Sequence, residues 1–193
     1  GSSIFSDFKA EAEEWQPDVI MGSATESTFL FARDLFQSAR KLNIPHVLGG
    51  VFATFAPEVA IGFPEIDIVC NGEGENIIAP LSKKLKLKED LSTLQNIWFK
   101  DTTGNIVKTP VGGAVNLDEN PPFDASIYDD ERFYRTIGGV MYRMFPVETH
   151  RGCPFKCTFC NSPLQDSWYK EKTGQSYFRK RSIKNVLADI RYF

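Results

Sequence analysis

Apolar residues recur along the first half of the chain with two different spacings. In three segments they return every three or four residues, the period of a helix with one buried face, as Phe29, Ala32 and Phe36 do. These segments are 4–15, 26–42 and 75–88. Between them lie short apolar runs at 17–22, at 44–50 and in a stretch ending near Cys70, which are typical of buried strands. The pattern therefore predicts helices and strands in alternation.

Helices that alternate with strands at this interval favour an α/β fold with a parallel, doubly wound sheet. Sheets of this kind bind ligands beyond the carboxyl ends of their strands. The predicted carboxyl ends are the segments 22–25, 49–50 and 71–75, and each contains glycine. Glycine allows a positive φ or a close approach of the backbone to a ligand. For any single glycine, the simpler interpretation is that it only ends a strand.

The second half of the chain shows less regular patterns. Residues 96–110 have two apolar segments around Thr-Gly-Asn, which predicts a hairpin. Residues 117–130 are rich in proline and carboxylates and suit an extended connector. We expect a strand over 140–150 and an amphipathic helix over 181–193. The helix would have Ser182 as its N-cap and would bury Ile183, Val186, Leu187 and Ile190.

Composition sets outer limits on the function. The 193 residues are 42% hydrophobic and 13% aromatic, which is enough for a folded core, and the net charge of -3 gives no general reason to expect nucleic acid or membrane binding. Residues 168–193 carry seven Lys or Arg, which we interpret as a solvated helix face rather than a nucleic-acid patch. No apolar run has the length of a membrane-spanning helix, and the start lacks a signal-peptide pattern. Free, closely spaced thiols indicate a reducing cytoplasm.

Three of the four cysteines lie within "RGCPFKCTFC", residues 151–160. The spacing is Cys153-x-x-x-Cys157-x-x-Cys160, and the rest of the chain offers only Cys70, so a disulfide framework fits poorly. A structural zinc site would need a fourth ligand, for which His150 is the candidate. Thiolates at short spacing also suit iron and sulfide, and a cluster held by three of them leaves one iron open for a small molecule. Cys70 lies in an apolar strand and is interpreted as a buried filler.

The CxxxCxxC motif, with Phe159 just before its last cysteine, resembles the signature of the radical S-adenosylmethionine enzymes. The resemblance implies that Cys153, Cys157 and Cys160 ligate a 4Fe-4S cluster whose fourth iron binds S-adenosylmethionine. It implies an α/β barrel, generation of a 5'-deoxyadenosyl radical, an external electron donor and a small-molecule substrate. In such enzymes the cofactor carries the radical chemistry while the protein positions it.

The three glycine-bearing strand ends, taken together, resemble the cobalamin-binding half of a large radical subfamily. That resemblance implies a Rossmann/flavodoxin-like sheet and a corrin site lined by the following residues of this chain: Ser23, Thr25, Gly49, Gly50, Glu73, Gly74 and Glu75. Members of the subfamily begin with two further strands and a loop that in many cobalamin proteins carries a cobalt-ligating His. Neither strand is expected in this sequence, which we expect to start at the helix before the third strand, so no cobalt-ligating His is assigned. His46 starts a strand and lies at the other end of the sheet.

From these resemblances we expect a truncated doubly wound parallel sheet followed by the first strand, loop and helix of a radical S-adenosylmethionine barrel. The expected domains are 1–115, a partial cobalamin-binding domain with a hairpin, then a linker over 116–139, and 140–193, the start of the barrel. The parent protein would transfer methyl groups to carbon or perform oxidative cyclisation, and this chain alone would be inactive.

Two further expectations concern class and association. The alternative class is a non-catalytic Rossmann-like binding module with an Fe-S or zinc knuckle. We also expect self-association through an open strand edge near residues 19–21, because an unpaired apolar strand is a template for another chain.

Overall fold

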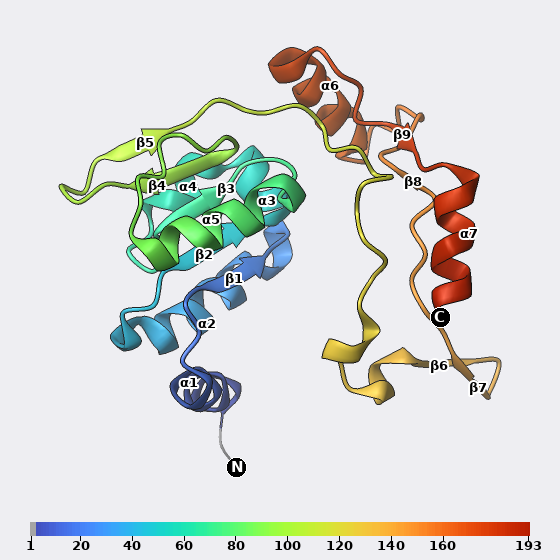
Figure 1. The fold of residues 1–193 in the computed structure, drawn as a ribbon, viewed down its shortest axis with the longest axis horizontal. Helices are drawn as coiled ribbons and strands as arrows, with labels where there is room; N and C mark the ends of the chain where they lie inside the picture. The colour runs from blue at the N-terminus through green and yellow to red at the C-terminus, as the bar shows by residue number, and fades with distance from the viewer. Residues whose placement is uncertain (1–2) are drawn as a thin grey trace. The chain divides into compact units, whose positions relative to one another are not determined.

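The structure is a computed structural model that describes residues 3–193 (Figure 1). The chain divides into two compact units, Gly1–Gly113 and Ala114–Phe193. Each unit is described by itself below.

The first unit is built on a five-stranded sheet in the order β1-β2-β3-β4-β5. The strands are β1 Ile20–Ser23, β2 His46–Gly49, β3 Ile68–Cys70, β4 Ile97–Lys100 and β5 Ile106–Lys108. The first three are parallel, which confirms the predicted doubly wound core. The predicted hairpin is β4 and β5, and it extends the sheet because β4 pairs antiparallel with β3. The sheet is therefore mixed rather than wholly parallel.

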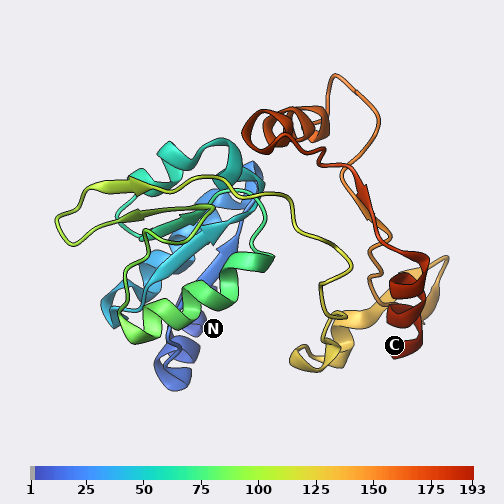
Figure 2. The same ribbon diagram turned by 45° about the horizontal axis from the view of Figure 1, so that its top comes forward.

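Helices cover both faces of this sheet (Figures 1 and 2). The three predicted helices are observed as α1 Ile4–Trp15, α2 Phe29–Ala39 and α5 Glu75–Leu87. Short 3-10 turns, Glu26–Thr28 and Arg40–Leu42, flank α2. Two helices that the sequence did not predict, α3 Gly50–Phe55 and α4 Pro57–Gly62, follow β2 directly. Pro57 begins α4 at a position where its missing N–H costs nothing.

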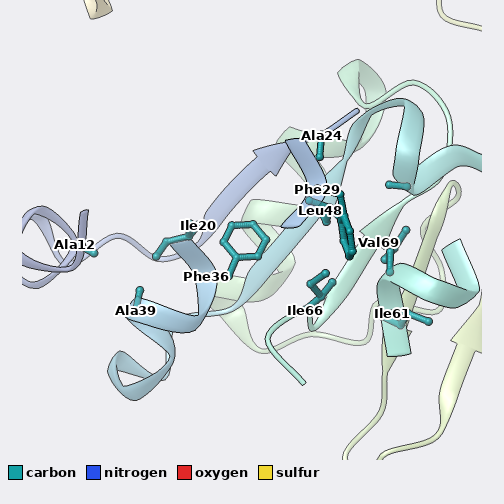
Figure 3. Close-up of a cluster of buried hydrophobic side chains, with 12 residues drawn as sticks. Ala12, Ile20, Ala24, Phe29, Phe36, Ala39, Leu48, Ile61, Ile66 and Val69 are labelled. Atoms are coloured by element: carbon teal, nitrogen blue, oxygen red, sulfur yellow. The ribbon is translucent and has the colours of Figure 1, made fainter. Parts of the chain in front are cut away.

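Adjacent residues of the strands point to opposite faces and build two separate cores. On one face, Leu48 and Val69 pack with Phe29 and Phe36 of α2 and with Ile61 of α4, as Figure 3 shows. On the other face, the second core joins β2 to β4 with α5 and contains Val47, Ile68, Ile77, Leu81, Ile97 and Phe99. Burying each such side chain contributes about 1.5–3 kcal/mol. These two cores hold the carboxyl ends of the strands in position.

The amino end of β2 carries a buried histidine. The ring of His46 stacks on Phe36 with the centroids 4.8 Å apart, and its Nδ1 lies 2.9 Å from the carbonyl oxygen of Glu65. Burial lowers the pKa of His46. Arg40 donates two hydrogen bonds of 2.7 Å to the carboxylate of Asp67, which also accepts the backbone N–H of His46. This network lies at the opposite end of β2 from the predicted site, as the sequence indicated.

The second unit contains two short sheets and two helices. The elements are two 3-10 turns, Ala125–Ile127 and Asp130–Phe133, strands β6 Tyr134–Ile137, β7 Val140–Arg143, β8 His150–Arg151 and β9 Arg179–Lys180, and helices α6 Ser162–Thr173 and α7 Ile183–Tyr192. β6 pairs antiparallel with β7 through a turn in which Gly138 and Gly139 have positive φ, and β8 pairs antiparallel with β9.

Three expectations for this unit need correction. The single strand predicted over 140–150 is wrong: its first part is one arm of a hairpin, and only His150 belongs to a second strand. The helix expected after the cysteine loop was the one over 181–193. In the structure, α6, which was not predicted, is the first helix after that loop. α7 is confirmed with Ser182 as its N-cap, but its apolar face is only partly buried, since Ile183 is 79% exposed and Ile190 54%, whereas Val186 is partly buried.

None of the helices formed by residues 3–193 combines the length and apolar character needed to span a bilayer.

Candidate functional site

The carboxyl ends of β1, β2 and β3 meet at one edge of the sheet. Ser23 is level with Gly49 across the β1–β2 pair, and Leu48 is level with Val69 across the β2–β3 pair. The loops that follow these strands therefore lie side by side. The structure brings together the strand-end residues that the sequence singled out.

The start of α3, which follows β2 directly, fits tightly against the loop after β1. Gly50 has a φ of +92°, and a Cβ there would lie 2.6 Å from the carbonyl oxygen of Ala24 and 2.7 Å from Ser23 Oγ. The N–H of Ala24 donates to the oxygen of Gly49 at 3.1 Å, and the N–H of Phe52 donates to the oxygen of Ala24 at 3.1 Å. Only glycine satisfies both the φ value and the close approach at position 50.

Two hydroxyl side chains stand at this edge. Ser23 and Thr25 are both exposed. Thr25 begins the turn before α2, where its backbone N–H donates to Thr28 Oγ1 at 2.9 Å and its own hydroxyl lies 3.1 Å from the same oxygen. These short local bonds hold the turn and leave both residues facing outward.

The loop after β3 leads into α5. Gly74 is the N-cap residue of α5, and its carbonyl oxygen accepts the N–H groups of Ile77 and Ile78. Glu75 lies exposed in the first turn of α5, whereas Glu73 is 6% exposed and its carbonyl oxygen accepts a 3.3 Å bond from Asn96 Nδ2. The loop thus presents one outward and one buried glutamate.

Cys70 lies beneath these loops and acts as a filler, as the sequence predicted. It is 8% exposed, and a Cβ added at Gly49 would lie 3.8 Å from its Cβ, while one added at Gly74 would lie 3.7 Å from its Sγ. Burial, and then the charge of Glu75, raises the pKa of the Cys70 thiol to about 11.

Sequence reasoning missed three buried polar residues under the loops: Thr54, Asn71 and Asn96. Periodicity carries no signal for a buried polar side chain. The one signal in the sequence that could have found them is their position near the glycine segments, since Thr54 follows Gly50 by four residues and Asn71 follows β3 directly. Within the part of the chain that is described, Asn71 Oδ1 is buried and accepts no hydrogen bond. Such an orphaned acceptor is costly unless a ligand or water supplies a donor.

The three clustered cysteines lie in the loop between β8 and α6. Gly152 opens the loop with a φ of +83°, and a Cβ there would lie 2.8 Å from the carbonyl oxygen of Tyr177. The N–H of Cys160 donates to the oxygen of Cys157 at 3.2 Å. Cys160 Sγ lies 3.4 Å from Ser162 Oγ and accepts the N–H of Ser162 at 3.5 Å, and these bonds lower the pKa of the Cys160 thiol.

The thiols share one loop but do not converge. Cys157 and Cys160 are exposed, Cys153 is partly exposed, and Phe159 is 92% exposed. Over residues 3–193, no three side chains of His, Cys, Asp or Glu come together in a metal-holding group. His150 Nδ1 lies 3.0 Å from Thr149 Oγ1, which is a local contact. The donor set itself fits a soft metal or an iron–sulfur cluster, because it consists of three accessible thiols.

Comparison with known families and curated proteins agrees with this architecture. Residues 2–82 match the family described as B12 binding domain. An uncharacterized methyltransferase of Pyrococcus horikoshii is 31% identical over 190 residues, which is 96% of this chain and 39% of the relative. The anaerobic magnesium-protoporphyrin IX monomethyl ester cyclase of Rubrivivax gelatinosus is 29% identical over 91% of this chain and 31% of the relative. The chain thus spans well under half the length of these relatives.

Solved structures share the fold. The radical S-adenosylmethionine methyltransferase TsrM from Kitasatospora setae, with cobalamin and a [4Fe-4S] cluster bound, superposes with a TM-score of 0.62 and 17% identity over 96% of this chain and 37% of that chain. The cobalamin-dependent S-adenosylmethionine radical enzyme OxsB, with aqua-cobalamin and S-adenosylmethionine bound, gives a TM-score of 0.67 and 21% identity over 98% of this chain and 25% of that chain.

Proposed function

We propose a function from the premise that this chain contains a B12-binding domain and is a homologue of the cobalamin-dependent radical S-adenosylmethionine methyltransferases and cyclases. The whole protein binds cobalamin, a 4Fe-4S cluster and S-adenosylmethionine, and transfers a methyl group to carbon or performs an oxidative cyclisation on a small-molecule substrate. An external donor supplies its electrons in a reducing cytoplasm. Because the chain spans 39% or less of the relatives named above, this activity is proposed for the whole protein.

The cobalamin site is proposed at the carboxyl ends of β1, β2 and β3. The observation that carries this proposal is the close fit at Gly50, inside the segment that matches the B12 binding domain. Ser23 and Thr25 would offer hydroxyls to the corrinoid, and the Gly49–Gly50 backbone would form the floor. Glu73, Gly74 and Glu75 would form the adjoining wall. No axial histidine is assigned, since His46 is buried at the other end of β2.

The cluster site is proposed in the loop between β8 and α6. Cys153, Cys157 and Cys160 would supply three thiolates, with Phe159 beside the last of them. When bound, the cluster and S-adenosylmethionine supply the radical chemistry. The exposed loop supports this proposal, because its thiols are accessible to iron and sulfide.

Two measurements on the purified chain test the two sites. For the corrinoid, hydroxocobalamin binding is followed by equilibrium dialysis. Ser23→Phe places a ring over the strand ends and should weaken binding at least tenfold, whereas Thr93→Phe, at an exposed position between α5 and β4, should not. Equal binding by both variants contradicts the site.

For the cluster, the chain is reconstituted anaerobically with iron and sulfide. Adding S-adenosylmethionine should perturb the electron paramagnetic resonance spectrum of the reduced cluster, since one iron is open to it. Replacing any of the three loop cysteines by Ala should abolish the brown absorbance, and Cys70→Ala should leave it. A spectrum that ignores S-adenosylmethionine, or tight zinc binding in place of iron, would favour the non-catalytic module.

A further inference from the structure

Thr54 connects α3 to the loop after β3 at the proposed corrinoid site. It lies in α3 and is 4% exposed. Its hydroxyl donates to the carbonyl oxygen of Gly50 at 3.0 Å and accepts the N–H of Gly72 at 3.1 Å. The first bond, to a carbonyl one turn earlier, is common for threonine in a helix. The second is informative, because it joins α3, which follows β2 directly, to the loop after β3.

Asn71 and Asn96 continue the network from the other side. The N–H of Asn71 donates to the carbonyl oxygen of Asn96 at 2.7 Å, and its Nδ2 lies 3.4 Å from the oxygen of Thr54. Asn96 has a φ of +59°, donates from Nδ2 to the oxygen of Glu73, and accepts the N–H of Gly112 at 2.5 Å. All three side chains are at most 5% exposed, so their hydrogen bonds are sheltered from water.

The hydroxyl of Thr54 thus links the glycine that begins α3 to the glycine loop after β3. Glycine has the greatest conformational freedom of any residue. A ligand that contacts both segments binds more tightly when they are held in place before it arrives.

We propose that Thr54 is a positioning residue of the corrinoid site, whose hydroxyl holds the start of α3 and the loop after β3 at the separation that the ligand requires. The inference rests on the proposed function. Thr54 does not have to touch the corrinoid, since it acts through Gly50 and Gly72. Its role therefore depends on both halves of the hydroxyl, the donor and the acceptor.

The test compares two substitutions. Thr54→Val keeps the volume and removes the hydroxyl, which leaves the Gly72 N–H without its partner. Thr54→Ser keeps the hydroxyl and loses a buried methyl group. The protein should therefore be less stable, while the hydrogen bonds to Gly50 and Gly72 remain. Ile61→Val, in the core on the α2 face of the sheet, serves as a destabilised control that makes none of these bonds.

Hydroxocobalamin binding and amide hydrogen exchange are then measured on each protein. We expect Thr54→Val to raise the Kd at least tenfold and to speed exchange of the Gly72 N–H, and Thr54→Ser and Ile61→Val to stay within about threefold of the parent chain. If the parent chain binds and Thr54→Val binds equally well, the positioning role is overturned and the site stands. If Ile61→Val weakens binding as much as Thr54→Val, the effect is one of stability and the role is again overturned. If the parent chain does not bind hydroxocobalamin, the corrinoid site proposed in this chain fails and takes this role with it.

Discussion

Alkylation of the native chain should separate Cys70 from the three loop cysteines. The thiol of Cys70 is 8% exposed and has a pKa of about 11, against an ordinary value of 9.0. Only the thiolate reacts, and at about pH 8 roughly one in a thousand Cys70 side chains is ionised, compared with about one in ten for an ordinary thiol. Ionisation alone therefore slows Cys70 about a hundredfold, and burial slows it further.

The assay is limited exposure to iodoacetamide under anaerobic conditions, followed by peptide mass spectrometry. In the cluster-free protein, Cys153, Cys157 and Cys160 should be modified while Cys70 stays intact until the chain is unfolded with urea. After reconstitution with iron and sulfide, the three should become protected together. Modification of Cys70 at the rate of the loop thiols would refute the buried assignment. Protection of only one or two loop thiols would refute the three-ligand set.

Three further predictions concern the first unit. Gly22→Ala places a Cβ 3.0 Å from the ring of Phe36, so it should lower the free energy of unfolding in urea by about 1–3 kcal/mol. The double variant with Phe36→Leu should lose less stability than the sum of the two single variants, and strict additivity would contradict the clash. Because burial lowers the pKa of His46, the unfolded chain takes up the proton before the folded chain does, and the free energy of unfolding should fall as pH drops below about 6.5. His46→Gln should make the free energy of unfolding depend less on pH in this range. An unchanged pH dependence would exclude His46 as its source. If β1 is an open edge, the chain should self-associate, which sedimentation at several concentrations would detect. Met21→Lys should weaken this association without unfolding the protein, since Met21 is exposed whereas Ile20 is buried. A monomer at every concentration would contradict the open edge.

The sequence predicted the elements whose apolar pattern is long enough to read. α2 and α5 span 11 and 13 residues and show a clear buried face, and the three parallel strands are short apolar runs between them. α3 and α4 have six residues each, fewer than two turns, and Pro57 interrupts the pattern between them. A helical period is not detectable over so short a span.

Pairing and tertiary burial were harder to predict than element type. The hairpin at 96–110 was predicted from its turn, but nothing local specifies that β4 pairs with β3. Over 140–150, the apolar run was read as one strand, whereas the Gly138–Gly139 pair before it is itself a hairpin signal. α6 buries only Tyr169, so its amphipathic pattern is weak.

The two candidate sites differ in how much of their geometry the chain supplies in advance. The strand ends are fixed by two apolar cores, and Gly50, Thr54 and Asn71 lock the loops above them, so a corrinoid meets a surface that is already formed. The cysteine loop has its thiols wholly or partly exposed and not grouped, so a cluster would have to gather them as it bound. In such a case the free energy of metal binding also orders the loop. Each thiolate then contributes to both events, and loss of any one of the three should abolish the cluster rather than weaken it by a third.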